Sequence, residues 1–102
     1  MLIDYEGRAI RLTEERWDHI SEHPEMTAMR VALEETLRAP EIVVESLHDP
    51  SARLYYRFYR RTMVGGKYLC GVVKGTKRDA FVITAYLTDR VKKGRILWPK
   101  KL

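Results

Sequence analysis

Two histidines four positions apart, His19 and His23, have the spacing in this sequence that most directly suggests chemistry. In a helix they share a face, and Arg16 lies on that face too. A histidine pair can remove one proton and deliver another near neutral pH, as attack of a ribose 2′-hydroxyl on the adjacent phosphate requires. Two half-buried packing residues beside Trp17 and Ile20 would show the same spacing, so both interpretations stay open.

A strand with a basic, aromatic face is the second candidate. Between residues 53 and 62, Leu54, Tyr56 and Phe58 alternate with a second set, and we expect these three to face the core. The opposite face then carries Arg53, Tyr55, Arg57, Tyr59 and Arg61. Guanidinium groups pair with phosphates and phenol rings stack on unpaired bases, so this face has the residue types that bind single-stranded RNA. A solvated face with arginine stacked on tyrosine is the alternative.

A later strand offers Thr84 and Tyr86 on one side, with Lys74 of the preceding strand in phase. Thr84 can bond a phosphate oxygen, Tyr86 can stack or donate its hydroxyl, and Lys74 can add a cation. Such residue types are also common in central strands without any function.

A metal site is the other chemical use of the histidine pair. Zinc would need a third ligand, such as His48 or a carboxylate. The sequence has no His-Glu-x-x-His order and a single cysteine, Cys70, so we expect neither a metal nor a cofactor.

The charge of the chain divides sharply after Ala52. Residues 1–52 hold five Lys/Arg and twelve Asp/Glu, a net charge of −7, and residues 53–102 hold fourteen and two, a net charge of +12. A regional positive field of this kind favours a polyanion, and nucleic acid is the first candidate.

The pattern of the chain predicts an α+β fold, in which two N-terminal helices pack on one face of a four- to five-stranded antiparallel sheet. Helices are expected at 14–23, capped by Thr13, and at 27–38, with Met29, Leu33 and Leu37 buried. Strands are expected at 41–47, 53–62, 67–74 and 79–87, with a small hairpin at 2–12 and a last strand around residues 96–98.

One domain over residues 1–102 is expected, made of an acidic helical part (1–40), a basic antiparallel sheet (41–98) and a tail (99–102). The start of the chain carries acids where a signal peptide carries basic residues, and no apolar run reaches the roughly 18 residues of a membrane helix. We therefore expect a cytoplasmic protein that does not bind membranes.

The order of these features resembles the small phage-associated members of the barnase/EndoU/colicin/RelE-like nucleases, the BECR fold. The resemblance rests on His19-Ile20-Ser21-Glu22-His23-Pro24, on Arg38-Ala39-Pro40 before a strand, on the Tyr/Arg strand and on Val82-Ile83-Thr84-Ala85-Tyr86. It implies an α+β nuclease fold, metal-independent RNA cleavage and use as a toxin or phage effector. Attack by the ribose 2′-hydroxyl would leave a 2′,3′-cyclic phosphate. Its active face would hold His19, His23, Thr84 and Tyr86, and Glu22 departs from the basic residue expected there.

The full expectation is thus an endoribonuclease with catalytic His19, His23, Arg57, Thr84 and Tyr86, and RNA-binding Arg16, Arg53, Tyr55, Tyr59, Arg61 and Lys74. A non-catalytic RNA-binding module is the first alternative. An interaction protein is the second: its positive sheet would meet an acidic antitoxin or immunity protein, or the acidic helices of another copy. We expect a monomer or a weak homodimer.

Overall fold

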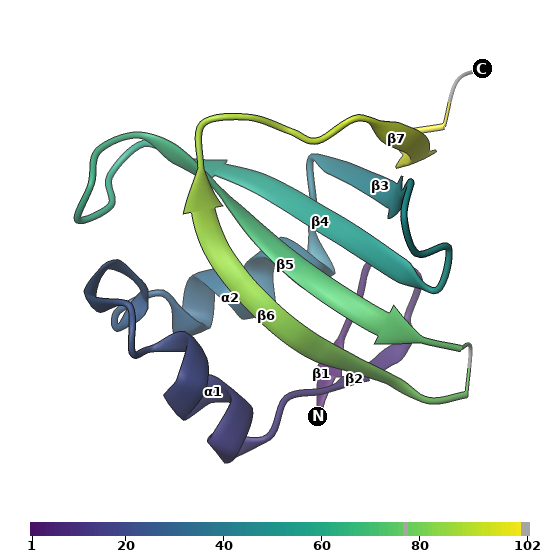
Figure 1. The fold of residues 1–102 in the computed structure, drawn as a ribbon, viewed down its shortest axis with the longest axis horizontal. Helices are drawn as coiled ribbons and strands as arrows, with labels where there is room; N and C mark the ends of the chain where they lie inside the picture. Colours follow the sequence, from purple (N-terminus) through teal and green to yellow (C-terminus); the bar gives the residue numbers. More distant parts are fainter. Residues whose placement is uncertain (77, 101–102) are drawn as a thin grey trace.

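The two helices of the molecule lie on the same face of a strongly twisted sheet (Figure 1). The computed structural model describes residues 1–76 and 78–100. In these residues the helical elements are α1 (Glu14–Ile20), the short 3-10 helix η1 (Pro24–Met26) and α2 (Arg30–Arg38). The strands are β1 (Leu2–Ile3), β2 (Ala9–Arg11), β3 (Ile42–Ser46), β4 (Ala52–Tyr59), β5 (Lys67–Gly75), β6 (Ala80–Thr88) and β7 (Gly94–Trp98).

The α+β class is as expected, but the expectation of a four- to five-stranded antiparallel sheet was wrong. In the described residues the sheet has seven strands in the order β1-β2-β6-β5-β4-β3-β7, and β2 pairs with β6 in parallel. The four strands from β3 to β6 form an antiparallel meander. The terminal segments extend this meander at both ends. Strand β2 pairs with the outer edge of β6, and β7 pairs with the outer edge of β3.

Both helices are shorter than their sequence patterns suggest. Thr13 caps α1 as expected, and its hydroxyl accepts a 3.1 Å hydrogen bond from the Arg16 amide. The helix ends at Ile20 because Pro24 begins η1. Thr27 closes that turn, so α2 begins only at Arg30.

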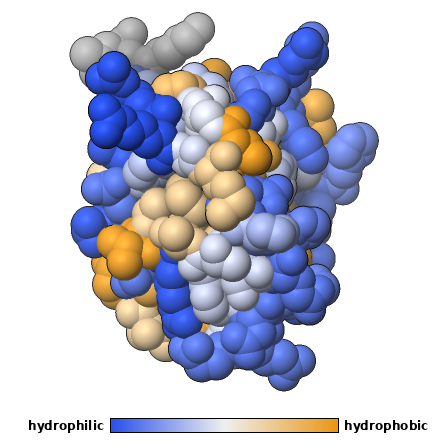
Figure 2. All heavy atoms as spheres, turned by 90° about the vertical axis from the view of Figure 1, so that its left-hand side faces the viewer, coloured by the Kyte–Doolittle hydropathy of each residue, from blue (hydrophilic) through white to orange (hydrophobic). Residues whose placement is uncertain are grey.

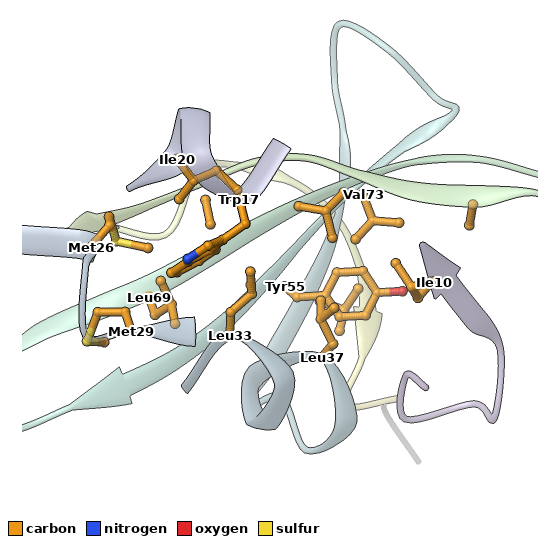
Figure 3. Close-up of a cluster of buried hydrophobic side chains, with 14 residues drawn as sticks. Ile10, Trp17, Ile20, Met26, Met29, Leu33, Leu37, Tyr55, Leu69 and Val73 are labelled. Carbon is orange, nitrogen blue, oxygen red and sulfur yellow. The ribbon is translucent and has the colours of Figure 1, made fainter. Parts of the chain in front are cut away.

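The main core lies between the helices and the sheet (Figure 3). The predicted stripe of α2 is buried there, with Leu33 and Leu37 fully enclosed. Gly71 in β5 allows this approach, because a Cβ at that position would lie 2.9 Å from Leu33 Cδ1. Trp17 and Ile20 of α1 complete the same core.

A smaller buried cluster lies on the other face of the sheet, which we call the open face. It consists of Val44, Leu54, Tyr56 and Cys70, with Val91 packed against it. Val91 belongs to residues 89–93, the crossing segment, which carries the chain from the end of β6 to β7 on the far side of the sheet (Figure 1). The crossing segment therefore covers part of a face that the helices leave bare.

The two ends of the sheet come close together although they are edges. The ring of Tyr5, which follows β1, has its centroid 5.4 Å from that of Trp98 in β7. Helix α2 contacts β1 as well as β4 and β5. The sheet thus curls around α2, with β7 as the last strand at one end of its order.

Candidate nucleic-acid interface

The two tyrosines on the Arg/Tyr face of β4 point toward the helices. Tyr55 has no exposed surface, and its ring lies among Leu33, Leu37 and Ile10 (Figure 3). Tyr59 donates its hydroxyl to Glu35 at 2.6 Å and to the Ala32 carbonyl at 3.0 Å. The Tyr55 ring is thus enclosed in the core, away from any RNA base, whereas the partly buried Tyr59 ring is tied to α2 through its hydroxyl. Alternation separates the two faces of a strand but does not say which one the helices cover.

The arginines of the same face hold the acidic half of the chain. Arg53 pairs with Glu6 at 2.7 Å. Arg57 donates to the Ala39 carbonyl at 2.7 Å, and its Nε lies 3.4 Å from Glu35. Both guanidinium groups are thus engaged within the fold, and we do not carry Arg57 forward as a catalytic group or Arg53 as an RNA-binding one.

These contacts are part of a wider neutralisation between the two halves of the sequence. In the part of the chain that the structure describes, four cations after residue 52 pair with acids before it: Arg53–Glu6, Arg57–Glu35, Lys74–Asp49 and Arg95–Glu45. Lys74, which was expected to bind RNA, has its Nζ 2.9 Å from Asp49. Part of the positive charge of residues 53–102 is thus neutralised by acidic side chains of the same chain.

His19 and His23 lie on the helix side of the molecule. His19 is exposed, with Nδ1 3.7 Å from Glu22. It lines a hollow of about 520 Å³ together with Thr13, Glu15, Arg16, Asp18 and Glu22. His23 is an exposed residue that precedes η1. Three carboxylates around His19 and Arg16 oppose the approach of a phosphate.

The structure does not bring these histidines together with Thr84 and Tyr86. Helix α1 packs on the side of β6 that carries Val82 and Ala85, whereas Tyr86 belongs to the cluster on the open face. The predicted catalytic set is therefore divided between the two faces of the sheet.

Arg61 is also displaced from its expected place. Strand β4 ends at Tyr59, so Arg61 lies in the exposed turn before β5 rather than on the strand. Met63 and Val64 of that turn are exposed as well. The side of the molecule on which this turn projects is largely hydrophilic, with smaller hydrophobic patches between the polar residues (Figure 2).

The open face holds a hollow in which several polar side chains converge. Its volume is about 540 Å³. An apolar floor is formed by Ala52, Leu54 and Val72 of the two central strands. The rim is polar or basic and consists of Ser46, His48, Thr84, Tyr86, Lys92 and Lys93, with Leu47 beside them.

The crossing segment positions the two lysines of this rim. The Lys92 amide donates a 3.1 Å hydrogen bond to the Tyr56 hydroxyl, and its Nζ lies 5.9 Å from the centre of the Tyr86 ring. Val91, the preceding residue, packs on the buried cluster. Among residues 1–76 and 78–100, neither Lys92 nor Lys93 forms an ion pair, so both ammonium groups are open to an anion.

The phenols beneath the lysines stay protonated over the physiological range. Burial raises the pKa of Tyr86 well above its usual value, and burial raises the pKa of Tyr56 to about 12. Burial likewise raises the pKa of the Cys70 thiol to about 11. The rim therefore combines two cations with a neutral hydroxyl group and the imidazole of His48.

Sequence reasoning missed Lys92 and Lys93, and it considered His48 only as a metal ligand. The two adjacent lysines after β6 are a visible signal. Their proximity to His48 depends on the crossing segment, because β3 and β6 are not neighbours in the sheet.

Within the described part of the chain, no group of three His, Cys, Asp or Glu side chains is arranged to hold a metal ion. Neither helix found there is long and apolar enough to cross a bilayer. Comparison with protein-family models, with curated proteins and with solved structures found no match to this chain. The resemblance to BECR nucleases accordingly stays a prediction from short motifs.

Proposed function

We propose that this chain is a metal-independent endoribonuclease whose RNA lies across the open face of the sheet. The observation that carries the proposal is the convergence of Lys92, Lys93, His48 and Tyr86 on one hollow. Lysine ammonium groups bind phosphates as point charges, and an apolar floor beside them suits the face of an unpaired base.

The chemistry follows from these groups. A ribose 2′-oxygen bonds to phosphorus while the bond from phosphorus to the 5′-oxygen breaks. His48 takes the proton of the 2′-hydroxyl, and the Lys92 ammonium gives one to the leaving oxygen. Lys93 and the Tyr86 hydroxyl stabilise the negative charge that gathers on the phosphate oxygens. The products are a 2′,3′-cyclic phosphate and a free 5′-hydroxyl.

The proposal departs from the sequence-based assignment in its proton carriers, since it uses His48 in place of His19 and His23. The acidic surroundings of His19 support this change. Tyr86 and Thr84 keep their expected part in holding the phosphate, because both line the same hollow as the lysines.

The test is cleavage of mixed RNA in EDTA, with the new ends assayed for cyclic phosphate. We expect the parent protein to cleave, and His48→Ala to lose on the order of a hundredfold in rate while it still binds RNA. His19→Ala is the matched histidine control and keeps the parent rate. Loss of cleavage in His19→Ala but not in His48→Ala would place the active site on the helix side of the molecule. Binding without cleavage by the parent would instead identify a non-catalytic RNA-binding module.

A further inference from the structure

Strand β7 is an edge strand that offers a free row of backbone groups. It pairs with β3 along one side, and no strand among residues 1–76 and 78–100 pairs with its other side. Alternate N–H and C=O groups along such an edge are unpaired and can accept a further strand. Edge strands of natural proteins are usually blunted. The Tyr5 ring lies against the Trp98 end of β7, whereas residues 94–97 have no paired strand on this side among the described residues.

Apolar side chains accompany this free backbone. Ile96 is 60% exposed, and Trp98, whose ring packs on Tyr5, is 39% exposed. Ile96 lies beside a hollow of about 980 Å³, whose other lining residues are Glu41, Ile42, Gly94, Pro99 and Lys100. A strand added along β7 can place every second side chain over this hollow, because successive side chains of a strand alternate between its faces.

The positive charge around the edge of β7 favours an acidic strand as its partner. Lys92 and Lys93 precede β7 and Lys100 follows it, and none of the three has an ion pair within the described residues. Antiparallel pairing of β7 with the β7 of a second copy would bring Lys92 of one chain near Lys100 of the other. The opposite edge of the sheet, β1, has only two residues and offers a second copy little to pair with.

We propose that β7 binds an extended, acidic segment of a partner protein as an eighth strand of the sheet. The backbone of that segment pairs with residues 94–98, an aliphatic side chain covers Ile96, and its carboxylates meet Lys93 and Lys100. The proposal stands on the edge, the hollow and the cations alone, and it does not depend on RNA cleavage.

The probe is a short synthetic peptide in which glutamate alternates with valine, added to isotopically labelled protein and followed by amide NMR. We expect shifts concentrated at residues 94–98 and slower amide exchange there. Ile96→Ser weakens binding about tenfold, as loss of one buried aliphatic contact does. Val31→Ser, which changes a still more exposed aliphatic residue on α2, leaves the affinity unchanged.

Two further peptides test the geometry and the charge. Methylation of the amide nitrogens along one edge of the peptide abolishes binding, whereas methylation along the other edge does not, because only one edge faces β7. A peptide that alternates lysine with valine does not bind. Lys100→Glu weakens binding of the acidic peptide. Arg38→Glu, which makes the same change of charge on α2, is the control and leaves the affinity unchanged.

Three results would overturn the proposal. Absence of binding at millimolar peptide is one, and equal binding of both methylated peptides is another. The third is a concentration-dependent dimer of the protein whose interface protects residues 94–98, since it would assign the edge to a second copy.

Discussion

The hydroxyl of Tyr55 donates a 2.6 Å hydrogen bond to the buried carboxylate of Asp4, which links β4 to the turn after β1 across 51 positions of sequence. Arg8 donates to the same hydroxyl at 3.1 Å, and its Nε lies 3.5 Å from Asp4. Burial raises the pKa of Tyr55, and the adjacent Asp4 carboxylate raises it further, so the phenol stays a donor. The contact fastens the acidic N-terminal segment to the inner face of the basic strand.

Tyr55→Phe tests whether that ring belongs to the core rather than to an RNA-binding face. Loss of the donor leaves the Asp4 carboxylate buried with fewer partners, so we expect the free energy of unfolding to fall by about 1–3 kcal/mol. Chemical denaturation measures the fall, with Tyr68→Phe on the open face as the control. Unchanged stability together with weakened RNA binding would restore the original expectation for Tyr55.

The sequence predicted well what depends on local pattern. The Thr13 cap follows from the preference of threonine for the N-cap position. The burial of Leu33 and Leu37 follows from the helical spacing of apolar residues, and both signals lie within a few residues of sequence. Leu54 and Tyr56 of β4 are buried as expected, but the helices pack on the opposite face, which carries Tyr55. Both faces carry large side chains, and only tertiary packing chooses between them.

The candidate site was less predictable than the fold for a related reason. Its rim comes from the turn after β3, from β6 and from the crossing segment, which are brought together by strand order. The short strands β1 and β2 also gave little periodicity to recognise. Their parallel pairing with β6 depends on how the whole chain returns to that edge.

Cys70 is expected to react slowly in the folded protein. Its thiol is buried under Tyr56 and Tyr86, and the pKa is raised to about 11 from a usual value of 9.0. At pH 8.5 we expect alkylation by iodoacetamide to occur only through unfolding, so its rate rises with denaturant. Since the unfolded state loses this proton first, stability falls as the pH rises from about 9 to about 11. Rapid alkylation without denaturant would contradict the burial of the thiol.

Asp49 makes the turn between β3 and β4 sensitive to acid. Hydrogen bonds from Ser51 and the nearby Lys74 ammonium lower the pKa of its carboxyl from 3.8 to about 2. A lowered pKa in the folded state gives stability that is complete above about pH 4 and is lost as the pH falls toward 2. Asp49→Asn is expected to flatten this part of the stability profile. An identical acid slope in the variant and the parent would show that Asp49 is not the group responsible.

Tyr56 is expected to hold the crossing segment in place. Replacement by Phe removes the acceptor of the Lys92 amide hydrogen bond, which should cost about 0.5–1.5 kcal/mol of stability. The more specific result is faster hydrogen exchange of the Lys92 amide, measured by NMR, while β5 amides keep their protection. If the Lys92 amide exchanges equally fast in the parent protein, the segment is not held by this contact.

The central claim is that RNA binds the open face through the two lysines of the crossing segment. The most direct measurement compares two charge-matched double variants, Lys92→Ala with Lys93→Ala and Arg16→Ala with Arg38→Ala, for single-stranded RNA affinity over a range of salt concentrations. We predict that the double lysine variant reduces the magnitude of the slope of log K against log salt by about 1.4, the loss expected for two phosphate contacts. The double arginine variant should leave the slope unchanged. A reduced slope in the double arginine variant, with an unchanged slope in the double lysine variant, would contradict the account and place the RNA on the helix side.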